Sequence, residues 1–352
     1  MKKPTININN ASAIACVMAV SRVFFGVNID SAELCNSGWI SILLGGIIAF
    51  PLFFCIQRHV NVVQAGNSIP NHPLIRVSSL IFGIAALLDS AITARCISNS
   101  ASYAAFNHSI RFFLLVPLYI VVIWTVYCGG DAIGSNARIW IKLFPLYMLI
   151  IVACQITKYR ITWLFPILGP GTNGLFRGAI KAAGWISSAS AILIFSDKPA
   201  ENRKRTNLYL VYGLIVLIPT ALTLLRNMMA PVLISTDART RMFELDLMLT
   251  NGRSPLLLQL PLIVMWFISL FNLLCGDVFI VCAAITKLLP RIKPIYCVLA
   301  AAFASVFLSM SVLSEQNMEV LFSDWQFVVN ASAVAVIMLG SLLKGGMQEC
   351  ES

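Results

Sequence analysis

Charged residues are scarce in this sequence. Of its 352 residues, 11% are Asp, Glu, Lys or Arg and 59% are hydrophobic, whereas a soluble domain carries about 25% charged residues. So few charges cannot cover the surface of a soluble domain of this length. The long apolar segments that remain predict an all-α membrane protein that crosses the bilayer many times.

Residues that commonly carry catalysis or bind metals are also few. The three histidines, His59, His72 and His108, lack the spacing of metal ligands, and the ten cysteines form no CxxC motif. The GxGxxG pattern at 169–174 has no βαβ context and is expected to form a capping turn. We find no GxSxG, HExxH, Walker A or catalytic Cys/His arrangement. The sequence therefore predicts no enzyme, no metal and no cofactor.

The net charge of +10 does not indicate nucleic-acid binding. The basic residues fall in short loops that would lie on one side of a bilayer, as the positive-inside rule requires. Lys2 and Lys3 precede the first apolar segment, and Arg203, Lys204 and Arg205 lie on the same expected side. Both termini are therefore predicted to be cytoplasmic.

The whole chain, 1–352, is expected to form one polytopic membrane domain of about ten transmembrane helices. Two longer connections, 158–178 and 231–254, are predicted to cap the outer face. The first and sixth segments are five apart, which suggests two inverted repeats of five helices, about 10–157 and about 179–343. The ten apolar segments are 10–28, 38–57, 74–98, 112–129, 138–157, 179–197, 207–228, 257–287, 294–314 and 325–343.

The first apolar segment carries Ser21 and Arg22 in its interior. A charge at mid-membrane costs about 2.5–3.5 kcal/mol on insertion scales, so it usually faces protein or water. Either Arg22 extends to the outer interface, or this helix is broken and lines a site at mid-membrane.

Asp89, Lys142 and Asp277 are among the other ionisable residues inside apolar segments. Such residues are rare, and each is either part of a functional site or one member of an ion pair that fixes helix register. The sixth segment is rich in small and hydroxyl residues around Gly184. This composition fits either a second break or close helix packing.

Several features with a common order and spacing resemble the endospore germination permeases. These are the B subunits of nutrient germinant receptors, in the amino acid–polyamine–organocation (APC) transporter superfamily. The features are VSRVFFG at 20–26, Gly38-Trp39-Ile40, Phe165-Pro166-Ile167-Leu168 with Gly171, Gly184-Trp185, Arg253 and Trp266. The chain departs from the family at Ser21-Arg22, where a glycine is usual, and at the stretch with Gln259, where an acidic residue is typical.

The resemblance implies a LeuT/APC-like 5+5 inverted repeat with discontinuous helices 1 and 6. It also implies the spore inner membrane, partner subunits of the A and C types, and binding of a small nutrient such as an amino acid that triggers germination. The alternative is an active secondary amino acid transporter of the same superfamily.

In that fold, helices 1 and 3 lie side by side at the ligand. Arg22 would then bind a carboxylate and Asp89 an ammonium group, unless the two charges pair directly and close the site. Lys142 and Asp277 are predicted to form a coupling or structural pair on the inner side. The candidate ligand-binding residues are Ser21, Arg22, Asp89, Trp185, Ser187 and Ser188.

Overall fold

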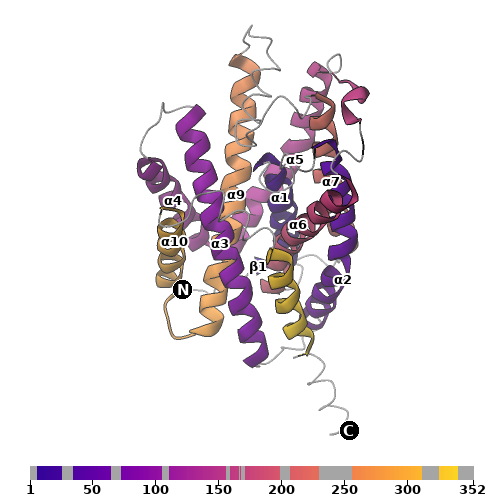
Figure 1. Ribbon diagram of the computed structural model, residues 1–352. Helices are drawn as coiled ribbons and strands as arrows, with labels where there is room; N and C mark the ends of the chain where they lie inside the picture. Colours follow the sequence, from indigo (N-terminus) through magenta and orange to yellow (C-terminus); the bar gives the residue numbers. More distant parts are fainter. Residues whose placement is uncertain are drawn as a thin grey trace.

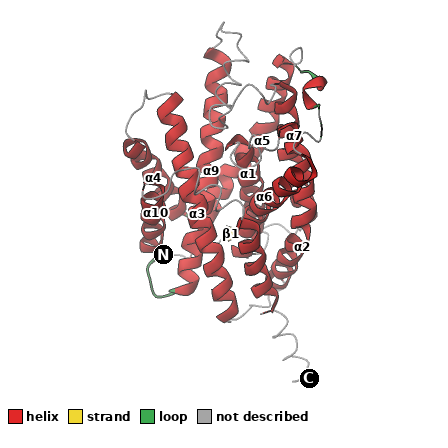
Figure 2. Cartoon of the chain, in the orientation of Figure 1, coloured by secondary structure: helices red, strands yellow, loops and turns green. Residues whose placement is uncertain are grey.

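A computed structural model of the chain is almost entirely helical (Figure 2). It describes residues 6–25, 35–64, 73–104, 111–155, 159–165, 167, 171–198, 207–229, 256–310 and 325–339. The predicted outer loop at 231–254 and its Arg253 lie outside these residues, as does Gly26.

Each of the ten apolar segments contains a helix. The first five are α1 (Ile8–Phe25), α2 (Gly38–Gln64), α3 (Pro73–Ala104), α4 (Arg111–Cys128) and α5 (Gly130–Gln155). The others are α6 (Gly171–Ala191), α7 (Leu208–Met229), α9 (Leu256–Leu288), α10 (Pro294–Met310) and a final helix, Trp325–Leu339. Three 3-10 turns, η1 (Cys35–Ser37), η3 (Ile161–Leu164) and η4 (Ile192–Phe195), and two short strands, β1 (Ile6–Asn7) and β2 (Ser196–Lys198), complete the described elements.

Five of these helices are long and apolar enough to cross a membrane, or up to six if the bent pair α4 and α5 counts as one span. By the same measure α10 and the final helix are apolar but shorter. The expected number of about ten crossings therefore corresponds to ten helices, of which about half have the length and composition of a full span.

Several helix boundaries differ from the sequence prediction by six residues or more, and two of them are helix starts. The helix expected from residue 138 begins at Gly130, so Arg138 lies in α5 and not in a loop. Gly129 has a φ of 101°, and at this residue the chain bends by 111° between α4 and α5. Likewise, α6 begins at Gly171, whose φ is 73°, and takes up the end of the expected outer loop 158–178. Glycine suits both positions because it has no Cβ to clash at positive φ.

The helix interruptions lie at other positions than predicted. α1 continues through Ser21 and Arg22 to Phe25, and α6 continues through Trp185 to Ala191. The irregular backbone follows α6, as η4 and β2, and precedes α1, as β1. The two strands pair in parallel, with Ile6 opposite Ser196. This pairing satisfies backbone groups that would otherwise be unbonded inside the protein.

The helices form a bundle in which α4 and α10 lie on one side and α2 and α7 on the other (Figure 1). Between them α3 packs along α9, and α1 packs on α5, α6, α7 and α9. The contact between α2 and α6 is especially close. A Cβ added at Gly45 would lie 2.6 Å from the Ala182 Cβ and 2.8 Å from the Ala179 carbonyl oxygen.

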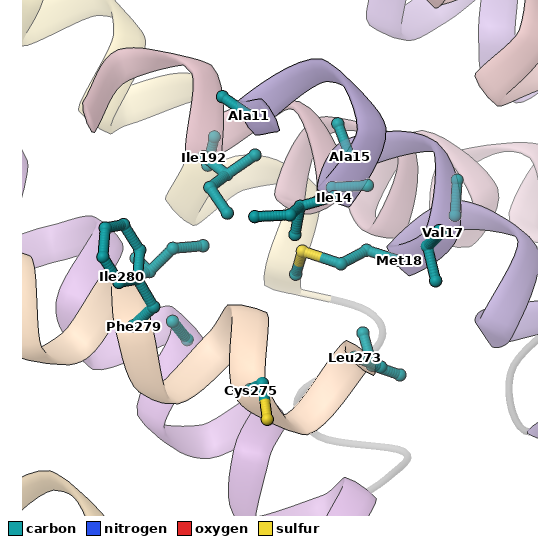
Figure 3. Close-up of a cluster of buried hydrophobic side chains, with 14 of the residues drawn as sticks. Ala11, Ile14, Ala15, Val17, Met18, Ile192, Leu273, Cys275, Phe279 and Ile280 are labelled. Carbon is teal, nitrogen blue, oxygen red and sulfur yellow. The ribbon is translucent and has the colours of Figure 1, made fainter. Parts of the chain in front are cut away.

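The core around α1 is apolar. Ile14 and Met18 of α1 face α9, near Phe279 and Ile280, and Ile192 of η4 lies beside them (Figure 3). A Cβ added at Gly276 of α9 would lie 2.7 Å from the Met18 sulfur. This close contact brings the next turn of α1, which carries Arg22, near the middle of α9.

Candidate functional site

A buried ion pair joins α1 to α3 at the centre of the bundle. An Nη atom of Arg22 contacts Oδ2 of Asp89, and both side chains are buried. The same Oδ2 accepts hydrogen bonds from Ser188 Oγ of α6, at 3.0 Å, and from Gln326 Nε2 of the final helix, at 2.8 Å. A buried ion pair is stable only when such bonds compensate the loss of water. Four helices therefore meet at one carboxylate.

Of the two predicted alternatives, ligand binding by the separate charges or direct pairing, the structure shows Arg22 and Asp89 paired directly. The charges that were predicted to hold opposite ends of a ligand hold each other. Arg22 does not extend to an interface, because its side chain is buried and paired. α1 also needs no break to accommodate it, since Asp89 supplies the compensating charge.

The other predicted ligand-binding residues lie around this pair with separate partners. Ser187 Oγ donates to the Gly184 carbonyl at 2.7 Å and accepts from Asn330 Nδ2 at 3.0 Å. Ser21 Oγ lies 2.6 Å from the Val17 carbonyl and 2.8 Å from the Ser269 carbonyl of α9, so it links two helices. The hydroxyls of Ser21 and Ser187 thus bond to backbone carbonyl groups. Of the three predicted serines, Ser188 alone contacts a charged group.

Trp185 is buried on α6, one turn before Ser188. Its indole Nε1 donates no hydrogen bond to any described residue. A buried indole N–H normally finds a partner. Trp185, a predicted ligand-binding residue, therefore carries a buried hydrogen-bond donor one turn of α6 before Ser188.

Gln326 and Asn330 were missed by the sequence analysis. They lie four residues apart on the final helix, so both face α6 and the ion pair. Asn330 Nδ2 also lies 3.1 Å from the Gly184 carbonyl, as an alternative to Ser187. Their signal was polar side chains at helical spacing in an apolar segment.

Asp277 of α9 is completely buried. Neither carboxylate oxygen hydrogen-bonds to a described residue, although the group interacts electrostatically with Asp89 and Arg22. The cluster of Arg22, Asp89 and Asp277, hereafter the charge cluster, thus has one positive and two acidic groups.

The expected pair of Lys142 and Asp277 does not form in the structure. Lys142 is exposed on α5, whereas the buried face of that helix carries Trp140 and Phe144, with ring centroids 4.4 Å apart. Lys142 is two residues from both Trp140 and Phe144, and two positions along a helix rotate the side-chain direction by about 200°. Lys142 therefore points away from the core. α5 instead contacts α9 through Asn136 Nδ2 and Asn272 Oδ1, at 2.9 Å.

A chain of buried hydroxyl groups links α3, α4 and α10 near the charge cluster. Ser90, the neighbour of Asp89, donates to Ser305 Oγ at 2.8 Å, and Ser305 is hydrogen-bonded to the Tyr119 hydroxyl. All three side chains are buried or largely so, and Tyr119 also interacts electrostatically with Asp277. The centre of the bundle is therefore polar over several helices, as in proteins that admit a solute to mid-membrane.

Comparison with known proteins identifies the fold. No protein-family model matches the chain, and no curated protein matches it. Among solved structures, the chain is similar to MHP1, a nucleobase-cation-symport-1 family transporter, in a closed conformation with bromovinylhydantoin bound. The TM-score is 0.54 at 11% sequence identity, and the match covers 91% of this chain and 75% of MHP1. The protein is an integral membrane protein with a LeuT/APC-type fold.

Proposed function

We propose that the protein binds a small nutrient, such as an amino acid or a similar cation, at the charge cluster. In this proposal it is the B subunit of a spore nutrient germinant receptor. The observation that carries the proposal is the charge cluster itself, buried where α1, α3, α6 and α9 meet in a transporter-type fold. Intramembrane charges of this kind mark substrate sites and pathways in membrane proteins.

The germination role depends on the family resemblance in the sequence. The resemblance implies the spore inner membrane and receptor subunits of the A and C types as partners. The positive-inside pattern of the basic residues separately implies that both termini are cytoplasmic. Nutrient binding in the membrane would then change the arrangement of the helices around the charge cluster and pass that change to the partners.

The second candidate is active secondary transport of the same solutes. The similarity to MHP1 favours it, since MHP1 is described as a transporter. The two functions use one binding site and differ in whether the solute crosses the membrane. They can therefore be separated only by measuring binding, transport and assembly on the same protein.

Co-expression with A-type and C-type subunits, followed by purification, tests assembly. Reconstitution of the same preparation in proteoliposomes tests uptake of labelled amino acids. A receptor subunit should co-purify with its partners and bind a nutrient without concentrating it. Concentrative uptake by the isolated chain would favour the transporter, and absence of binding to any amino acid or amine would refute both.

Trp185 offers a test of the site with a matched control. Trp185→Phe removes the unpartnered N–H donor but keeps an aromatic ring, so it should weaken nutrient binding severalfold. Trp140→Phe removes another buried indole N–H without a described partner, but on α5 against Phe144. Equal effects of the two variants would contradict placement of the site at the charge cluster.

A further inference from the structure

We propose that Asp277 binds a protonated amine, and that the preferred ligand is an organic cation without a free carboxylate. The inference rests on the proposed solute-binding function and narrows the class of ligand. It also moves the recognition of the amine from Asp89, where the sequence placed it, to the other carboxylate of the charge cluster.

The first step is that Arg22 and Asp89 already neutralise each other. Asp89 Oδ2 contacts the guanidinium and accepts bonds from Ser188 and Gln326. A ligand ammonium that displaced these groups would leave Arg22 buried without its counter-charge. Breaking a buried pair in this way is strongly unfavourable, so the pair is fixed and a ligand must use other groups.

The second step is that Asp277 has no such compensation. It is 0% exposed, and both its oxygens lack hydrogen-bond partners among the described residues. The charged groups that act on it are Asp89 and Arg22. Because those two charges offset each other, an ionised Asp277 has no counter-ion among the described residues. A buried carboxylate in this setting requires a cation or a proton.

The third step places Asp277 level with the ion pair. Gly83 of α3 packs closely against Ala284 of α9, since a Cβ added at Gly83 would lie 2.8 Å from the Ala284 Cβ. Asp89, further along α3, interacts with Asp277, which comes earlier in α9. The two helices are therefore antiparallel here, and the two carboxylates lie at a similar depth.

Hydrogen-bonding groups without described partners lie on the neighbouring helices. Thr93 is four residues beyond Asp89, on the same face of α3, and its hydroxyl is buried without a described partner. Asn330 Oδ1 on the final helix is another such acceptor. Both can accept from an amine N–H, and neither supplies a positive charge for a carboxylate.

The charge balance then selects the ligand class. A ligand with one positive charge makes the charge cluster neutral. A zwitterion brings a carboxylate as well, and the guanidinium that could receive it is occupied by Asp89. The structure therefore favours amines and amino acid amides over the corresponding amino acids.

Matched pairs of compounds test this directly. Binding of L-alanine and L-alaninamide, L-leucine and L-leucinamide, and L-phenylalanine and L-phenylalaninamide would be measured by calorimetry at pH 7 on the full chain in nanodiscs. We expect at least one amide to bind tenfold or more tightly than its parent amino acid. Asp277→Asn should weaken amide binding at least tenfold, and Asp277→Glu should retain most of it.

Asp131→Asn is the matched control. Asp131, at the start of α5, accepts bonds from the Asn7 N–H and Asn10 Nδ2, and the same chemical change there should leave the amide preference unaltered. Asp277→Asn should fold, because it replaces a buried carboxyl group whose oxygens have no hydrogen-bond partner among the described residues, and its melting temperature should equal or exceed that of the parent.

Several outcomes would overturn the inference. If the amino acids bind more tightly than their amides, the ligand class is wrong while the proposed function stands. Unchanged amide binding in Asp277→Asn would mean that Asp277 holds a proton or an alkali ion instead. A lower melting temperature for Asp277→Asn would show that its charge is compensated. Absence of binding by all six compounds would overturn the inference, and only absence of binding across the amino acids and amines would remove the proposed function as well.

Discussion

Removal of the Asp89 charge should destabilise the protein more than any other single isosteric change in the charge cluster. Asp89→Asn removes the carboxylate in contact with the guanidinium of Arg22, which is 8% exposed, and leaves Asp277, which makes no hydrogen bond to it, as the remaining acidic group of the charge cluster. Breaking a buried ion pair from one side costs about 3–5 kcal/mol. The hydrogen bonds from Ser188 and Gln326 also weaken, because their acceptor is no longer ionised.

A double-mutant cycle measures this effect. The variants Arg22→Gln, Asp89→Asn and the double variant would be compared with the parent by thermal melting in detergent and by their amount in the membrane. Each single variant should melt well below the parent, and the double variant should recover much of the loss because neither member of the Arg22–Asp89 pair is left without the other. Asp131→Asn provides a control for the amide substitution itself. Additive losses in the double variant, or a parent-like Asp89→Asn with normal nutrient response, would refute the reasoning.

Three further predictions concern packing, the hydroxyl chain and topology. Gly45→Ala should lower stability by about 1–3 kcal/mol, because its methyl group would overlap α6; Gly213→Ala, in open space on α7, should be neutral or slightly stabilising in the same melting assay. Tyr119→Phe should cost about 1 kcal/mol by removing the hydrogen bond to the buried Ser305 hydroxyl, whereas Tyr209→Phe, at a side chain that is 48% exposed, should have no measurable effect. Cysteine-accessibility mapping should place 231–254 outside the cell, and labelling of that loop only after permeabilisation would contradict the predicted orientation.

The secondary structure was largely contained in the sequence. All ten apolar segments form helices, and most of their ends lie within a few residues of the prediction. Helix formation in an apolar segment depends on local backbone hydrogen bonding, which needs no knowledge of neighbours. The sequence likewise identified Arg22, Asp89 and Asp277 as charges inside the bundle, because few charged residues fall in its apolar segments.

The partners of those charges were not contained in the sequence. Asp277 was assigned to Lys142 from a resembling fold, but the rotation of α5 turns Lys142 outward. The contribution of Gln326 likewise depends on how the final helix approaches α3. The positions of the breaks also required the structure, because the extended segments at Ile6–Asn7 and Ser196–Lys198 are stabilised by each other.

The sequence by itself thus determined which segments are helical and which charges enter the membrane. Only the tertiary structure decided that Arg22 pairs with Asp89 and that the carboxyl group of Asp277 has no hydrogen-bond partner among the described residues. The physical reason is that a charge in a low-dielectric interior is stabilised by groups within a few ångströms. Helix rotation, register and crossing bring those groups together from parts of the chain hundreds of residues apart.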